Sequence, residues 1–174
     1  MRAGDREYGE HMNADPIKEA LRRLPYGFYS ITSRRGDEVN AMVGNWLTQV
    51  SFEPRMVLFG LSKIAYSHEL IAAAGVFAIN VFNKDDSEVI KGLTKARAKK
   101  PDKMAGVMWT PGPMTGCPVL EGAAAVIECR VAQLIDIGGD HDLLVGEVVN
   151  ALLLKPGDPH TSLTLPDLNW SYAG

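Results

Sequence analysis

Apolar residues gather in runs of strand length along most of the chain. Three short runs, at 28–33, 56–62 and 76–82, are rich in aromatic and branched residues, as buried strands are. Two longer runs, at 123–135 and 141–154, are separated only by the glycine turn DIGGD. A tight glycine turn between two alternating runs predicts a β-hairpin.

Helical patterns are few and short. The Asp-Pro pair at 15–16 is typical of a helix start, and an apolar stripe follows it. Ser67 is expected to cap a second helix, with Gly75 beyond its C-terminal end. A third, more polar helix is expected to begin at 86 or 87 and to continue to about 100.

Strands therefore outnumber helices, and no regular crossover helices separate them. This order favours a mainly β fold: a closed or nearly closed antiparallel barrel, Greek-key-like, with a few helices outside it. The length of 174 residues fits one domain. We expect that domain at 15–174, after a disordered or loosely attached tail at 1–14. The segment 101–118, rich in Pro, Gly and Met, predicts an irregular excursion.

Composition and charge narrow the function classes. The chain is 46% hydrophobic and 22% charged, as globular proteins are. Its net charge of -3 argues against nucleic-acid binding. The charged N-terminus lacks the features of a signal peptide, and no apolar run approaches the roughly 18 residues of a membrane span. We therefore expect a cytoplasmic protein without membrane or nucleic-acid partners.

The motifs of common catalytic sites are missing from the sequence. It contains no G-x-S-x-G, H-E-x-x-H, C-x-x-C or P-loop pattern, and no G-x-G-x-x-G. Asp140, His141 and Asp142 could hold a metal ion, but a polar hairpin turn explains them more simply, so no metal is expected. Cys129 alternates with apolar neighbours and is expected to be buried, whereas Cys117 lies in a Gly/Pro loop and is expected to be more accessible.

One stretch, NAMVGNWLTQVSFEP at 40–54, is neither continuously apolar nor alternating. Gly44 lets another group approach the backbone closely, and Trp46 offers a flat apolar surface. The polar side chains suit the rim of a planar, amphipathic cofactor, or an edge strand that faces water. These polar residues are Asn45, Thr48, Gln49 and Ser51.

A second stretch, SKIAYSHELI, joins the end of a strand to the start of a helix. Free backbone N–H groups and the helix dipole make such an end a ready phosphate site, which Ser62, Lys63 and Ser67 would complete. Alternatively, Ser67 only caps the helix and Lys63 is solvated. The basic run KARAKKPDK at 95–103 is expected to be a solvated helix face; the less favoured alternative is a contact for a nucleotide 2′-phosphate.

Taken in order, these segments resemble the flavin reductase family of FMN-binding split β-barrels. The resemblance covers GFYSITSRRGDEVNAMVGNWLTQVSFEPRMVLFGLSKIAYSHELIAAAGVFAINVF and, later, GCPVLEGAAAVIECRVAQLIDIGGDHDLLVGEVVNA. The terminal LNWSYAG is similar to the aromatic tail of the flavoredoxin-like branch. The matching order extends from about 25 to 174, so the tail at 1–14 lies outside it.

The resemblance implies where ligands bind. A segment along the flavin ring would comprise Gly44, Asn45, Trp46, Leu47, Thr48, Gln49, Val50 and Ser51. The ribityl phosphate would contact Ser62, Lys63, Ser67 and His68, and Asn80 would lie beside the site. The histidine that matches His141 lies near the nicotinamide side of the flavin in related reductases. On spacing alone, a turn residue is the favoured interpretation of His141.

The resemblance further implies an NAD(P)H-dependent flavin reductase, with FMN as cofactor and FAD less likely. Hydride would pass from the nicotinamide to FMN, and the electrons onward to an oxygenase or another acceptor. Because the flavin carries the chemistry, no catalytic side chain is expected. The alternatives are an FMN electron-transfer flavoprotein that a protein partner reduces and, less favoured, a non-redox binding module. The resemblance also implies a homodimer, and the run 141–154 supports it modestly, because it is apolar on both faces and needs cover on both.

Overall fold

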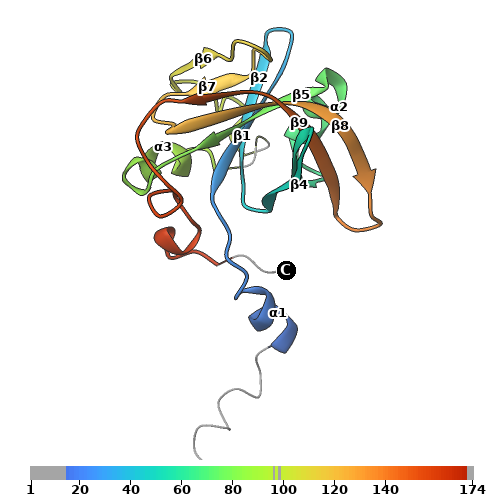
Figure 1. Cartoon of the computed structure of the whole chain (residues 1–174), viewed down its shortest axis with the longest axis vertical. Coiled ribbons are helices and arrows are strands. Elements are labelled where there is room, and N and C mark those ends of the chain that lie inside the picture. Colours follow the sequence, from blue (N-terminus) through green and yellow to red (C-terminus); the bar gives the residue numbers. More distant parts are fainter. Residues whose placement is uncertain (1–14, 96, 98, 172–174) are drawn as a thin grey trace, which may run out of the picture.

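The computed structural model describes residues 15–95, 97 and 99–171 of the chain, so the predicted tail at 1–14 lies outside the described residues. Within the described part, seven antiparallel strands form one curved sheet in the order β2-β1-β5-β8-β9-β4-β3 (Figure 1). The strands are β1 (Tyr29–Arg35), β2 (Glu38–Gly44), β3 (Leu47–Phe52), β4 (Arg55–Ser62), β5 (Val76–Val81), β8 (Ala125–Asp136) and β9 (His141–Leu153). The predicted mainly β barrel fold is thereby confirmed.

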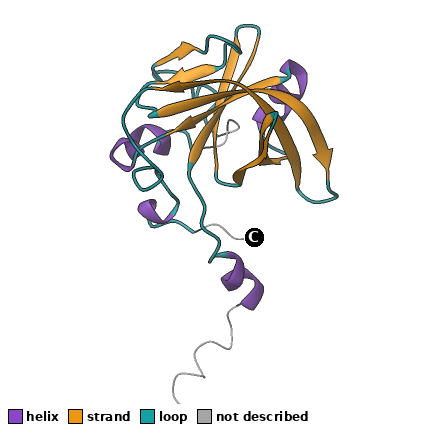
Figure 2. Cartoon of the chain, in the orientation of Figure 1, coloured by secondary structure: helices purple, strands orange, loops and turns teal. Residues whose placement is uncertain are grey.

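The helices lie outside the sheet, as Figure 2 shows by colour. They are α1 (Pro16–Leu21), α2 (Tyr66–Ala74), α3 (Ser87–Lys91) and the 3-10 helices η1 (Lys84–Asp86) and η2 (Pro166–Leu168). Among the described residues, no helix combines the length and apolar character that crossing a membrane requires.

The irregular stretch 40–54 is two strands, β2 and β3, joined through Asn45 and Trp46. These strands form the two edges of the sheet, and Asn45 and Trp46 carry the chain from one edge to the other. A Cβ atom on Gly44 would lie 2.4 Å from the ring of Phe59 on β4. Only glycine therefore lets the end of β2 approach β4 so closely. The N–H of Gly60 donates to the carbonyl of Trp46 at 2.9 Å and fixes the crossing.

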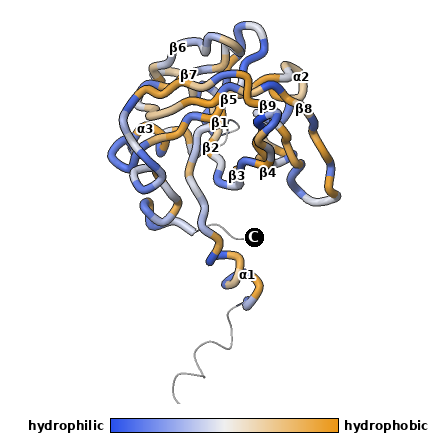
Figure 3. Tube along the Cα trace, viewed as in Figure 1, coloured by the Kyte–Doolittle hydropathy of each residue, from blue (hydrophilic) through white to orange (hydrophobic). Residues whose placement is uncertain are grey.

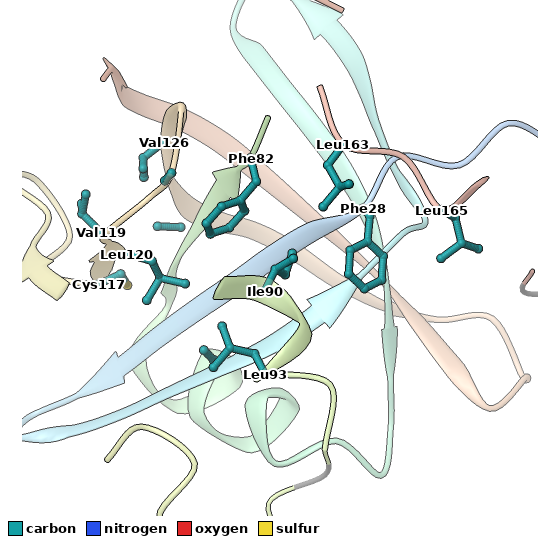
Figure 4. Packing of buried hydrophobic residues seen from close by; sticks show 13 residues of the cluster. Phe28, Phe82, Ile90, Leu93, Cys117, Val119, Leu120, Val126, Leu163 and Leu165 are labelled. Atoms are coloured by element: carbon teal, nitrogen blue, oxygen red, sulfur yellow. The ribbon is translucent and has the colours of Figure 1, made fainter. Parts of the chain in front are cut away.

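The predicted hairpin is formed by β8 and β9, which pair from Ala125 with Leu153 to Asp136 with Asp142. Two core clusters lie within the curved sheet and beneath the segments that cover it. One contains Ile31, Phe59, Phe77 and Leu144. The other packs the aromatic rings of Phe28, just before β1, and Phe82, just after β5, against α3 and the C-terminal segment (Figure 4). Its other members include Ile90, Leu93, Leu163 and Leu165.

Two helices differ from the sequence prediction. The N-cap of α2 is Ala65, without a side-chain cap, and Ser67 is instead buried inside the first turn. Helix α3 ends at Lys91 and does not continue to 100, because Gly92 is a poor helix former and the Thr94 hydroxyl donates to the Lys91 carbonyl at 2.9 Å. The basic run that follows is therefore not a helix face.

Helix α1 begins as predicted, with an Asp15 carboxylate oxygen accepting from the Ile17 amide at 3.0 Å. Its apolar stripe nevertheless has no cover within the described chain: the helix buries no residue, and Ile17 is 70% exposed. Figure 3 shows this apolar helix standing apart from the barrel. An amphipathic helix of this kind needs a second surface to pack on.

The excursion 101–118 is partly ordered, because β6 (Trp109–Pro111) pairs with β7 (Pro118–Leu120). Its turn is anchored by the buried carboxylate of Glu128 on β8, which accepts from the amide and hydroxyl of Thr115 at 2.8 and 2.7 Å. The same carboxylate accepts from the Asn150 side chain at 2.7 Å and from the Met114 amide at 3.2 Å. Burial alone would raise the pKa of Glu128, but these hydrogen bonds outweigh it and lower the pKa.

Both cysteines are fully buried. This agrees with the prediction for Cys129 and shows that the prediction for Cys117 was wrong, because the loop folds inward beneath β1 and β8. Burial raises the pKa of the Cys117 thiol to about 11 and that of Cys129 to about 12, so neither is a reactive thiolate at neutral pH.

Candidate functional site

Two adjoining cavities lie where β2, β4 and the start of α2 meet. We call the smaller one, of about 370 Å³, the aromatic cavity, and the larger one, of about 860 Å³, the basic cavity. Four residues line both and form the passage between them: Met42, Val43, Ser62 and Thr94. The two stretches that the sequence singled out therefore meet at one composite site.

The aromatic cavity is lined by Gly44, Asn45 and Trp46 from the β2–β3 connection. At Gly44 and Gly60 the space that a side chain would occupy is filled by the rings of Phe59 and Trp46, and a Cβ on Gly60 would lie 2.9 Å from the Trp46 indole. The C-terminal segment closes another side, where the ring of Trp170 meets Phe28 edge-on at 5.6 Å between centroids. Flat apolar surfaces of this kind suit the faces of a planar heteroaromatic ring.

His141 also lines the aromatic cavity, because β9 pairs with β4 so that His141 stands opposite Ser62. Its ring lies 4.7 Å from that of Trp46, and its Nδ1 lies 2.8 Å from an Asp140 carboxylate oxygen. The side chain is only 16% exposed. It is therefore part of the cavity wall and not a solvated turn histidine.

The basic cavity contains the four residues predicted for a phosphate: Ser62, Lys63, Ser67 and His68. They surround the N-terminus of α2, where no side chain caps the helix. Ser67 accepts a hydrogen bond from the amide of Asn40 at 2.8 Å. The other polar atom of the Asn40 side chain, Oδ1, is buried and has no hydrogen-bond partner among the residues that the structure describes. Sequence reasoning missed Asn40, since nothing along the chain links β2 to α2.

The charge of Lys63 is already compensated by acidic residues of the β8–β9 hairpin. Its ammonium lies 2.6 Å from Asp136 and 3.5 Å from Asp142, and the hydrogen bond to Asp136 is the main reason why the pKa of Lys63 is raised. Asp142 also lies 2.7 Å from Nε2 of His68. The predicted phosphate cation thus belongs to an internal ion-pair network.

Further cations reach the basic cavity from the segment after α3, where Lys95, Arg97 and Lys103 line it. Arg97 lies over the Tyr66 ring at 4.1 Å and 3.3 Å from Glu38. Lys103 is only 4% exposed, and burial, followed by repulsion from Lys100 and Arg97, lowers its pKa to about 8. The sequence had favoured a solvated helix face for this run, and Lys103 contradicts that interpretation.

Other predicted contacts lie elsewhere. Strand β3 leads away from the aromatic cavity, so Leu47, Thr48 and Gln49 line a separate apolar groove, and Val50 and Ser51 line neither cavity. The amide of Asn80 is buried in the core, where it accepts from Leu120 and donates to Thr32 and Pro118. Its polar atoms are therefore used by the fold.

Comparison with known proteins places this site in a family. A family model described as flavin reductase like domain matches residues 21–168. The chain belongs to the flavin reductase family. This confirms the resemblance that the sequence motifs indicated.

Similar proteins differ in length and in the activities their names carry. The chain is 39% identical over 132 residues to the reductase subunit HsaB of a flavin-dependent monooxygenase from Mycobacterium tuberculosis, covering 76% of this chain and 68% of HsaB. It is 32% identical to a putative diflavin flavoprotein from Nostoc, covering 83% of this chain but only 25% of that relative. The structure of a Streptomyces globisporus NADH:FAD oxidoreductase matches with a TM-score of 0.72 and 29% identity, covering 81% of this chain and 86% of that one.

Proposed function

We propose that this protein is an NAD(P)H-dependent flavin reductase that binds FMN across the two cavities. The observation that carries the proposal is the junction of the two cavities at Ser62, with the aromatic cavity on one side and the basic cavity on the other. FMN has the same division, with a planar ring at one end and a phosphate at the other. When bound, the flavin accepts a hydride from the nicotinamide and passes electrons on.

Each part of the site has a task in this proposal. The backbone at Gly44 and Asn45 meets the polar edge of the ring, and Trp46 covers an apolar part of it. The buried Oδ1 of Asn40, which lacks a hydrogen-bond partner, suits a ribityl hydroxyl as donor. Ser62, Ser67 and the N-terminus of α2 donate to the phosphate.

The direct test is steady-state oxidation of NADH and of NADPH with FMN and with FAD as the flavin, together with binding of each flavin by fluorescence. The proposal expects nicotinamide oxidation that depends on added flavin and tighter binding of FMN than of FAD. Binding of flavin without nicotinamide oxidation would favour the alternative, an electron-transfer flavoprotein. Binding of neither flavin would exclude both. The relationship to HsaB supports a flavin-dependent monooxygenase as the acceptor.

His141 is proposed to act on the nicotinamide. We expect His141→Ala to lower kcat/KM for NAD(P)H by about ten- to a hundredfold, the effect of losing one charge-assisted hydrogen bond. FMN affinity should change little, because the phosphate end lies in the other cavity. Stopped-flow reduction and flavin titration separate the two effects, and the exposed His160→Ala is the control. Loss of FMN binding would show that His141 holds the flavin instead.

A homodimer is proposed from the apolar surface that one chain leaves uncovered. A groove of about 870 Å³ runs beside β3, β4, β8 and β9, and its lining includes Leu47, Val57, Ile127 and Val148. Together with the exposed stripe of α1, it needs a second apolar surface, for which another copy of the chain is the simplest source.

We expect a dimer at micromolar concentration in light scattering. Thr48→Arg adds a charge to the edge of this groove and is expected to shift the protein towards monomer. Thr110→Arg adds the same charge on exposed β6, away from the groove, and should leave the dimer intact. A wild-type monomer would contradict the assignment.

A further inference from the structure

Lys103 is an almost fully buried lysine for which the described part of the chain supplies no counter-charge. It is 4% exposed and forms no ion pair or hydrogen bond through its ammonium with the described residues. Lysine is almost never fully buried unless it is paired, because desolvation of an ammonium group is costly. Lys100 and Arg97 repel it and further disfavour its charged form. The fold therefore carries an unfavourable group at the wall of the basic cavity.

The other charges around the basic cavity are compensated or open to solvent. Lys63 and His68 contact the carboxylates of the β8–β9 hairpin. Arg97 pairs with Glu38, and Glu69 pairs with Arg35 at 3.4 Å. Lys95 also lines the cavity but is exposed. Lys103 is thus the cation at this wall that is both buried and uncompensated.

We propose that Lys103, rather than Lys63, supplies the positive charge that binds the phosphate group of the flavin. The inference rests on the proposed flavin-binding function and names the residue responsible for recognising the phosphate. A dianionic phosphate beside Lys103 would provide the counter-charge that the protein omits. The N-terminus of α2, a helix of nine residues, faces the same cavity with its uncapped N–H groups.

The burial of Lys103 lowers the stability of the protein without ligand. Lys103→Met should therefore have two effects together: a more stable ligand-free protein and weaker FMN binding. Lys103→Met replaces the ammonium by an apolar group of similar length and removes the burial cost. We therefore expect its melting temperature without ligand to equal or exceed that of the wild type. If Lys103 only supported the fold, its replacement would lower the melting temperature instead. Stabilisation combined with weaker binding is typical of a functional site.

The experiment compares FMN and riboflavin binding by fluorescence titration for the wild type, Lys103→Met and Lys99→Met. Lys99 is exposed in the same basic segment and lies outside the cavity lining, so it controls for general charge. We expect Lys103→Met to weaken FMN binding by about ten- to a hundredfold, with little change for riboflavin, which lacks the phosphate. Inorganic phosphate should raise the melting temperature of the wild type but not of Lys103→Met.

Several results would overturn the inference. Equal losses of FMN and riboflavin would mean that Lys103 only shapes the cavity. An equal effect of Lys99→Met would mean that diffuse surface charge is enough. Unchanged FMN binding in Lys103→Met would leave the phosphate to other groups while the proposed function stands. If the wild type binds riboflavin and FMN equally, the basic cavity does not hold the phosphate; if it binds neither, the flavin proposal itself fails.

Discussion

Replacing Glu128 with alanine is expected to lower the free energy of unfolding by about 3–4 kcal/mol, close to the upper limit for a single substitution. The carboxylate is fully buried and satisfies donors from Met114, Thr115 and Asn150 at once. Without it, these partly buried donors lose their acceptor, and each donor that stays shielded from water costs about 1–3 kcal/mol. The turn at 112–117 should detach from β8 first.

Denaturant unfolding measures this effect, and the exposed Glu121→Ala serves as the control. The stabilisation should also depend on pH with a known sign. Because the folded-state pKa of Glu128 lies below its ordinary value of 4.5, its contribution is complete above about 4.5 and is lost as the pH falls through the folded-state pKa. The difference between wild type and variant should shrink in acid. A change within 0.5 kcal/mol at neutral pH, roughly that of a surface substitution, would refute this role.

Gly44→Val is expected to abolish flavin binding and to destabilise the fold by about 3 kcal/mol. Even the first added carbon would overlap the Phe59 ring, at 2.4 Å, and Phe59 is itself buried. Either the ring moves into the aromatic cavity or the end of β2 withdraws from β4. In both cases, the wall that would face the flavin ring is lost, so affinity should fall by at least about a hundredfold.

Gly139→Val is the matched control, because the Cβ position of Gly139 in the β8–β9 turn has no atom within 4 Å. A milder test in the same cavity is Gly60→Ala, whose added carbon meets the side chain of Trp46. Thermal unfolding and flavin titration of all three variants separate folding from binding. Wild-type flavin affinity in folded Gly44→Val would show that the aromatic cavity is not the ring site.

The sequence predicted the strands well because each is a local apolar run between turns. The turn DIGGD and the helix start at Asp15 were likewise local signals. The predictions failed where a distant contact decides the outcome. The sequence predicted Ser67 as a helix cap, but Asn40 on β2 donates a hydrogen bond to its hydroxyl. It also predicted Cys117 as an accessible loop residue, but the loop folds beneath β1 and β8 and buries it.

The candidate site shows the same limit. Ser62 and Gly44 were identified from local features, and the fold brings them to one site. Lys103 was not, because a lysine within a basic run normally faces water, and only the packing of the segment after α3 buries it. Nor does spacing reveal that Lys63 is compensated by Asp136, 73 positions away. Charge balance is a property of the folded surface, so it cannot be inferred from a basic run.

The contact between Trp170 and Phe28 has a kinetic consequence. An edge-to-face aromatic pair contributes only about 0.5–1.5 kcal/mol beyond the area it buries, and Trp170 remains 42% exposed. The segment that closes the aromatic cavity can therefore detach locally at far smaller cost than unfolding of the sheet. A flavin held there would exchange with bulk solution while the strands stay paired. Residence time and global stability should then vary independently among tail variants, and the dissociation rate of the flavin could be tuned at Trp170 without loss of the fold.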